Sequence, residues 1–161
     1  MTNPDPYSFH KVSSGDLDLL RTWHATPHVR TWWDADDDEI DDLSDPRVAR
    51  WIVHHAGRPF AYMQDYDVHG WDEHHFDDMP KGSRGIDQFI GVPDMVGIGH
   101  GTALIRARLR TLFATGAPAI GTDPHPDNAR AIAAYRKAGF VPAGPPRDTE
   151  WGLILPMVAV P

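Results

Sequence analysis

The residues best suited to do chemistry are three glycines at alternate positions, Gly97, Gly99 and Gly101. Ile98 and His100 separate the three glycines, and the whole segment lies between an expected strand and an expected helix. Glycine allows a tight turn and leaves backbone N–H groups open, and the positive end of a helix adds to their attraction for an anion. The spacing differs from that of a P-loop or a dinucleotide fingerprint. We therefore expect this segment to bind a pyrophosphate, with an ordinary glycine-rich turn as the alternative.

One carboxylate, Asp87, lies in the middle of a strand that we expect over Gly85–Ile90. It lies in a strand with the apolar residues Ile86, Phe89 and Ile90, where a carboxylate is costly unless it has a partner or a purpose. Asp87 is therefore our candidate for a general base. An ion pair with Arg84 or Lys81 that serves stability is the alternative.

The charge balance limits the possible partners. The formal net charge is −8, and the acidic residues concentrate in 34–45 and 65–78. A nucleic-acid-binding protein needs a basic surface, so we exclude that class. An acidic cleft would attract a cationic small molecule, whereas the simpler alternative is that the net charge only keeps the protein in solution. The absence of cysteine excludes disulfides, thiolate catalysis and thiolate metal sites.

The elements that must position these residues form the pattern of an α/β protein, and 161 residues suit a single domain, 1–161. No apolar run approaches the roughly 18 residues of a membrane span, and the first residues do not resemble a secretory signal, so we expect a cytoplasmic protein. Two runs joined by a short link with glycine, 50–55 and 60–66, predict a hairpin. Further strands are expected at about 7–12, 85–90, 119–122, 140–141 and 150–158, and helices at about 17–24, 27–33, 102–114 and 127–138.

The segment Thr122–Phe140 carries the most specific pattern. A strand leads into a turn with asparagine, and the helix that follows closes in Lys-x-Gly-Phe. In this the chain resembles the GCN5-related N-acetyltransferase (GNAT) superfamily, with Gly97–Gly101 as the upstream cofactor loop. One departure is Val96, which stands where the superfamily often has Arg or Gln. The matching residues are Asn128, Ala129, Ala131, Tyr135, Lys137, Gly139 and Phe140.

Shorter segments narrow the resemblance. They look like the corresponding parts of aminoglycoside 6'-N-acetyltransferases, and they are His28–Trp33, Gly70–Glu73, Arg84–Gln88 and Thr122–Pro124. The resemblance implies a GNAT-like α/β fold with a mixed, V-splayed central β-sheet flanked by helices. It also implies acetyl-CoA as cosubstrate and resistance to an aminoglycoside antibiotic through acetylation of its 6'-amine.

The resemblance also implies roles for single residues. Asp87 matches the aspartate that accepts the proton of the 6'-ammonium. The Tyr135 hydroxyl could protonate the leaving thiolate, although Tyr135 could equally be a core residue. Backbone N–H groups of Phe89 and Ile90 would hold the thioester carbonyl. Asn128 would bind the pantetheine arm or, alternatively, cap the helix. The remaining cofactor-binding residues are expected to be Gly97, Ile98, Gly99, His100, Gly101 and Thr102.

The acceptor is expected to be a cationic amine, bound by carboxylates and flat aromatic faces. Other acyl acceptors stay open, namely a siderophore hydroxylysine, a polyamine or another small amine. A non-catalytic CoA-binding sensor is an alternative from a different class. The protein is expected to be a monomer or a homodimer. The acceptor-binding candidates are Trp33, Asp34, Trp71, Asp72 and Asp123.

A metal site is not favoured. His54 and His55 are adjacent on an expected strand, so their side chains point to opposite faces and cannot readily share an ion. The second group of candidate ligands, within Glu73–Asp78, falls in an expected loop without a fixed helical spacing. We therefore expect no metal.

Overall fold

The structure is a computed structural model that describes residues 5–33 and 43–161. The chain divides into two compact units, Met1–Gln64 with Gln88–Val96, and Asp65–Asp87 with Gly97–Pro161. We call them the first unit and the second unit and describe each by itself. The expectation that residues 1–161 form a single domain stays a prediction.

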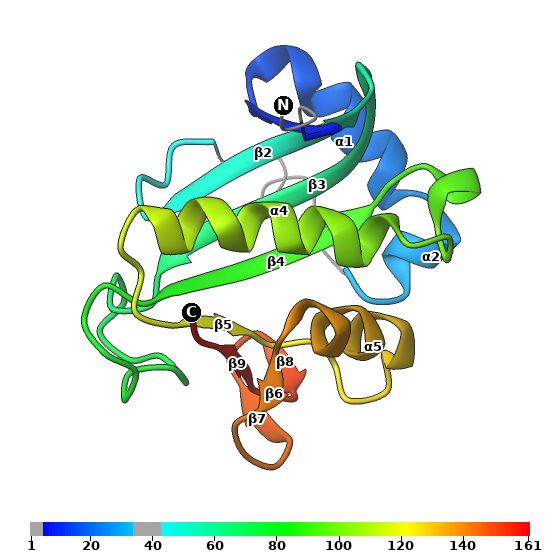
Figure 1. The fold of residues 1–161 in the computed structure, drawn as a ribbon. Helices are drawn as coiled ribbons and strands as arrows, with labels where there is room; N and C mark the ends of the chain where they lie inside the picture. Colours follow the sequence, from blue (N-terminus) through cyan, green and yellow to red (C-terminus); the bar gives the residue numbers. More distant parts are fainter. Residues whose placement is uncertain (1–4, 34–42) are drawn as a thin grey trace. The chain divides into compact units, whose positions relative to one another are not determined.

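Helices and strands follow one another as expected of an α/β protein (Figure 1). Among the described residues, seven strands are hydrogen-bonded in the order β1-β2-β3-β4-β5-β9-β6, and β7 and β8 form a separate pair. The β4–β5 pair is parallel and the β1–β2 pair antiparallel, so the sheet is mixed, as expected. The elements are β1 (Tyr7–Lys11), η1 (Ser14–Asp16), α1 (Leu17–His24), α2 (Pro27–Arg30), β2 (Val48–His55), β3 (Arg58–Asp67), β4 (Arg84–Ile90), η2 (Pro93–Met95), α4 (His100–Ala114), β5 (Ile120–Thr122), α5 (Ala129–Ala138), β6 (Val141–Pro142), β7 (Arg147–Thr149), β8 (Gly152–Ile154) and β9 (Met157–Ala159).

The first unit contains the hairpin predicted from the sequence. Strands β2 and β3 are neighbours in the sheet, and the chain turns between them at Ala56 and Gly57. These two residues have φ angles of +48° and +82°. Two successive positive φ angles match the twist of a tight two-residue hairpin turn. The hairpin prediction is confirmed.

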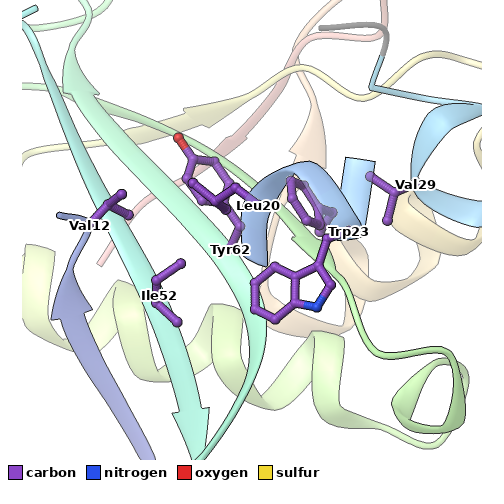
Figure 2. Packing of buried hydrophobic residues seen from close by; sticks show 7 residues of the cluster. Val12, Leu20, Trp23, Val29, Ile52 and Tyr62 are labelled. Atoms are coloured by element: carbon purple, nitrogen blue, oxygen red, sulfur yellow. The ribbon is translucent and has the colours of Figure 1, made fainter. Parts of the chain in front are cut away.

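The core of the first unit forms around helix α1 (Figure 2). Leu20 and Trp23 of this helix are 3% and 4% exposed. A Cβ at Gly91 would overlap the Trp23 ring, so glycine is what allows the chain to pass so close to the indole. The cluster comprises Val12, Leu20, Trp23, Val29, Ile52, Tyr62 and Phe89.

In the second unit, β5, β9 and β6 run side by side, and helices α4 and α5 pack against each other (Figure 1). Leu104 and Ile105 of α4 are fully buried. Helix α5 ends at Gly139, whose φ of +113° lies in the left-handed region that glycine adopts without strain. The expected helices over about 102–114 and 127–138 are both confirmed to within a few residues.

The C-terminal part differs from the prediction of one strand over Glu150–Val158. The chain instead forms the hairpin β7–β8 and then β9. Gly152 has a φ of +108°, and this turn folds β8 back onto β7. The single-strand prediction is wrong because it treated this glycine as part of a continuous strand.

The parallel ladder between β4 and β5 is short. Its register consists of Arg84↔Ile120 and Gly85↔Gly121, whereas β4 continues to Ile90. The partner strand β5 ends at Thr122. The ladder therefore stops early along β4, at the point where β5 ends.

Candidate functional site

Two carboxylates, Asp87 and Asp123, meet where the short parallel ladder ends. The register pairs Gly85 with Gly121, and Asp87 and Asp123 each come two residues after these glycines. The Thr122 hydroxyl donates a hydrogen bond of 2.9 Å to the carbonyl of the residue before Asp87, and this holds the two strands together. The side chains of Asp87 and Asp123 are hydrogen-bonded to each other. Two residues predicted separately, as base and as acceptor ligand, thus form one pair.

The environment of this carboxyl pair favours one retained proton. The Asp123 side chain is 15% exposed. Burial raises the pKa of Asp123, and the hydrogen bond with Asp87 opposes this rise. Two adjacent carboxyl groups resist double ionisation, so they titrate as a pair. A cation placed beside the pair would favour its full ionisation.

His75 extends the pair to a chain of three groups. Its Nε2 lies 2.9 Å from Oδ2 of Asp123, and its side chain is 1% exposed. Burial, followed by the charge of Arg147, lowers the pKa of His75. The sequence suggested this histidine only as a metal ligand, because its loop has no period that would reveal a contact with Asp123.

Two glycines make room for aromatic rings beside the carboxylates. A Cβ at Gly85 would overlap the ring of Tyr66, and a Cβ at Gly121 would lie 2.7 Å from the ring of Phe76. Burial, followed by the charges of the two carboxylates, raises the pKa of Tyr66, so its hydroxyl keeps its proton at neutral pH. Tyr66 was not predicted as a site residue. The only sign of it in the sequence was Gly85, because a glycine inside a strand often marks a close approach by another group.

Tyr135 of α5 is placed as a core residue would be. It is 3% exposed, and its ring meets Phe140 edge-on with centroids 5.3 Å apart. Its interaction with Tyr66 contributes to the raised pKa of Tyr66, so the two hydroxyls lie within electrostatic range of each other. The role of Tyr135 as an acid stays a prediction.

An aromatic group made of Trp71, His74, His75 and Trp151 borders the carboxyl pair. Trp151 is 52% exposed, and its ring centroid lies 5.1 Å from that of His74 and 6.3 Å from that of Trp71. Burial and the neighbouring His75 lower the pKa of His74 to about 4, so this imidazole is neutral at pH 7. Trp71 was a predicted acceptor ligand. Trp151 was not, because its place here depends on the β7–β8 hairpin.

A second buried carboxylate, Asp65, has cationic partners. Its oxygens accept hydrogen bonds of 2.6 Å from Arg84 and 2.6 Å from Arg108 of α4. Strand alternation also places Arg84 and Asp87 on opposite faces of β4. This placement favours Asp65 over Asp87 as the partner of Arg84.

The glycine segment before α4 has the conformation expected of an anion cradle. Gly97 and Gly99 have φ angles of +76° and +98°, and a Cβ at either would meet no atom within 4 Å. The side-chain side of each glycine therefore faces open space. Helix α4 starts at His100, directly after Gly99, and the first N–H groups of a helix have no partner within it. The cofactor roles of Gly97, Ile98, Gly99, His100, Gly101 and Thr102 stay predictions that this geometry fits.

Three predicted residues lie in the first unit. Phe89 is 6% exposed in its core, and the ring of Trp33 packs against it with centroids 5.0 Å apart. Trp33 thus packs against the core of this unit, and its role in acceptor binding stays a prediction. The Ile90 carbonyl accepts a hydrogen bond of 2.7 Å from Nε2 of His28. Asp34, a fourth predicted residue, lies outside the described residues.

The remaining predicted positions are Asn128 and Asp72. The Asn128 side chain accepts a hydrogen bond of 3.3 Å from the N–H of Ala131 and so caps α5. This is the capping role considered as the alternative, and a contact with the cofactor stays a prediction. Asp72 is exposed in the loop that carries Trp71.

Metal-ligating groups and membrane-spanning helices are two further features to consider in the described part of the chain. Within residues 5–33 and 43–161, no three or more His, Asp or Glu side chains are grouped so that they could hold a metal ion. No helix in these ranges has both the length and the apolar character needed to cross a membrane.

Comparison with known sequences identifies relatives of the chain. Residues 13–146 match the family described as acetyltransferase (GNAT) domain. The chain is 32% identical over 152 residues to the aminoglycoside N(6')-acetyltransferase type 1 of Klebsiella pneumoniae. That match covers 84% of this chain and 74% of the relative.

Solved structures agree with the sequence relatives. A structure of AAC(6')-Ib in complex with paromomycin and acetyl-CoA superposes with a TM-score of 0.86 at 30% identity and covers 97% of this chain and 94% of its own. A structure of the aminoglycoside acetyltransferase AAC(6')-Ib with coenzyme A and kanamycin has a TM-score of 0.85 at 31% identity and covers 96% and 94%.

Proposed function

Since this chain belongs to the GNAT acetyltransferase family, we propose that it transfers the acetyl group of acetyl-CoA to a primary amine, the 6'-amine of an aminoglycoside antibiotic. The observation that carries the proposal is the pair Asp87–Asp123, bordered by the aromatic group. Carboxylates attract the ammonium groups of such a sugar, and flat aromatic faces suit its rings. The relatives named aminoglycoside acetyltransferases support the choice of acceptor.

Acetyl-CoA supplies an activated thioester to this reaction. Asp87 would accept the proton that the acceptor's ammonium must lose before its nitrogen can attack the carbonyl carbon. The carbon–sulfur bond then breaks, and Tyr135 would donate a proton to the departing thiolate. The second proton that the nitrogen loses as it becomes an amide would return Tyr135 to its neutral form. Backbone N–H groups of Phe89 and Ile90 would hold the carbonyl oxygen as it gains charge.

The cosubstrate would be held mainly by backbone groups. The N–H groups of the Gly97–Thr102 segment would bind its pyrophosphate at the start of α4, where the helix dipole favours an anion. The open space beside Gly97 and Gly99 supports this role. Asn128 would reach the pantetheine arm with the part of its amide that does not cap α5.

The acceptor would contact Asp123 and Trp71 directly. Asp72, on the same loop as Trp71, would bind a second ammonium group of the sugar, and Trp33 and Asp34 would complete the set. We place the reaction in the cytoplasm, where acetyl-CoA is supplied by metabolism. The enzyme would act there as a monomer or a homodimer, and modification of the drug would confer resistance.

The direct test is turnover with a panel of amines. Purified protein with acetyl-CoA should release coenzyme A in the presence of kanamycin or ribostamycin, and NMR of the product should locate the acetyl group on the 6'-nitrogen. Faster turnover of spermidine or N-hydroxylysine would replace the aminoglycoside by one of those acceptors. Tight binding of coenzyme A without turnover of any amine would identify a sensor instead.

A further inference from the structure

His75 is a buried titratable group that takes no part in the proton transfers described above. Its Nε2 lies 2.9 Å from Oδ2 of Asp123, and 1% of its side chain is exposed. Its Nδ1 is buried and has no hydrogen-bond partner among the described residues. The ring stacks on His74 with centroids 4.0 Å apart, at an angle of 25°. The hydrogen bond to Asp123 is therefore the one polar contact that the fold gives this buried imidazole among the described residues.

The loop that carries His75 is itself held in place. The N–H of His74 donates a hydrogen bond of 2.9 Å to Oδ2 of Asp77, and the N–H of Asp77 donates one of 3.1 Å to the carbonyl of His74. The N–H of Phe76 donates to Nδ1 of His74. These bonds define the turn on either side of His75, so the imidazole has little freedom to leave Asp123.

We propose that His75 is a positioning residue for acetyl transfer, whose Nε2–H donates to Asp123 and thereby keeps the Asp87–Asp123 pair ready to ionise. The proposal rests on the function proposed above, because it assigns a role within that reaction. It adds a residue that neither the motif nor the family resemblance singled out.

The charge state of His75 determines the direction of its hydrogen bond. Burial, followed by the charge of Arg147, lowers the pKa of His75, so the imidazole is neutral at pH 7 with one N–H. With the proton on Nε2, the bond to Asp123 is that of a donor to a carboxylate. The unpartnered Nδ1 is then a bare lone pair, and a buried acceptor without a partner is less costly than a buried N–H without one.

The donor acts on the carboxyl pair as a unit. A hydrogen bond to the ionised form of an acid lowers its pKa, so the Nε2–H opposes the rise caused by burial. Without it the pair would hold its proton to higher pH, and less of the enzyme would have Asp87 ready as a base. The titratable and charged groups that face Asp123 and His75 are Tyr66 of β3, Asp87 of β4, His74 and Asp77 of the loop after β3, Tyr135 of α5 and Arg147 of β7.

The kinetic experiment compares His75→Phe with His75→Gln. Phenylalanine fills the same space without a donor, whereas the glutamine amide can donate again. In the profile of kcat/KM against pH with kanamycin, the acidic limb should move up by about one pH unit in His75→Phe and return towards the wild-type position in His75→Gln. At pH values above the limb, kcat should change by less than about threefold. The matched control is His69→Gln in the same loop, which should leave the limb in place.

A purely structural role for His75 would give a different result. Activity would then fall at every pH, with the limb unmoved and no recovery in His75→Gln, and this outcome would overturn the proposal. A limb that moves to lower pH would also overturn it, because Asp123 would then be the donor.

A second measurement needs no turnover and no variant. Nitrogen-15 NMR of the wild-type protein should find the His75 proton on Nε2 between about pH 6 and 8, and a proton on Nδ1 would refute the proposal. If no amine in the panel is acetylated, the proposed function fails, while this measurement still decides the state of His75.

Discussion

Asp65 and Asp123 are two carboxylates of the second unit that the fold removes from water, and their neighbours are opposite in kind. The Asp65 side chain is 2% exposed and accepts hydrogen bonds from Arg84 and Arg108. The Asp123 side chain is 15% exposed and bonds to another acid, Asp87, and to an imidazole that burial keeps neutral.

The difference teaches how a structural carboxylate can be told from a functional one. Asp65 has guanidinium groups on both of its oxygens, so its charge is compensated within the fold. The partners of Asp123 leave the site with an acid pair that gains from an arriving cation. Burial and residue type are similar in the two cases, so the neighbours decide the role.

The largest effect should come from removing the base of the functional pair. Asp87→Asn keeps the shape and hydrogen-bonding capacity of the side chain but cannot accept the proton, so kcat should fall by about 10²–10⁴-fold. The affinity for acetyl-CoA should stay the same, because the role proposed for the carboxylate is towards the acceptor. Steady-state kinetics with kanamycin at saturation would measure this. Asp78→Asn, at an exposed position, is the control, and a kcat of Asp87→Asn within threefold of wild type would make Asp87 structural.

The next effect concerns the structural carboxylate. Asp65→Asn leaves the largely buried Arg108 and the partly exposed Arg84 without their anion, and this should lower the free energy of unfolding by about 3–5 kcal/mol. Urea denaturation would measure the loss. The control is Asp94→Asn, which breaks the exposed ion pair with Arg58 and should cost less than about 1 kcal/mol. Equal losses in the two variants would remove the distinction drawn between Asp65 and exposed acids.

A third variant tests the glycine loop before α4, where backbone N–H groups and not charged side chains are proposed to bind the cosubstrate. Gly99→Val places a side chain beside the N–H groups of the cofactor loop and should weaken acetyl-CoA binding at least tenfold, about 1.4 kcal/mol. Gly116→Val is a matched control, because Gly116 at the other end of α4 also has a positive φ, +101°, and open space around it. Calorimetry should find weaker binding in Gly99→Val alone. Equal affinity in two folded variants would refute the loop assignment.

The smallest effect concerns the stability cost of the functional pair. Folding raises the pKa of Asp123 through burial, so the folded state binds this proton more tightly than the unfolded state. Stability is therefore lost as pH rises from the unfolded value near 4 to the higher folded value. Asp123→Asn removes this loss and should be as stable as wild type at pH 7, or more stable by up to about 1 kcal/mol. A marked destabilisation by Asp123→Asn would place Asp123 with Asp65.

Local patterns predicted much of this molecule. The glycines before α4, the β2–β3 hairpin and helix α5 with its terminal Gly139 each follow from residues within a short window, where periodicity and turn chemistry act. Asp87 and Asp123 could each be nominated in the same way, from the cost of a carboxylate in a strand and from the resemblance to a family.

The contacts between distant segments could not be predicted. That Asp87 and Asp123 touch depends on the register of β4 with β5, and no residue of either strand encodes that register alone. His75 lies in a loop without a period, and its contact with Asp123 spans 48 residues of sequence. Trp151 lies beside Trp71 because the chain turns at Gly152, and the apolar pattern of this segment had predicted a continuous strand instead.

The carboxyl pair also bears on what happens after the transfer. An ammonium group that binds beside Asp87 and Asp123 leaves as an amide, which is neutral and carries no proton that either carboxylate can accept. The acetylated product therefore lacks the charge that drew the acceptor to the pair. The product should therefore bind more weakly than the acceptor, and inhibition by product should be weak, because the reaction itself removes the charge that is attracted.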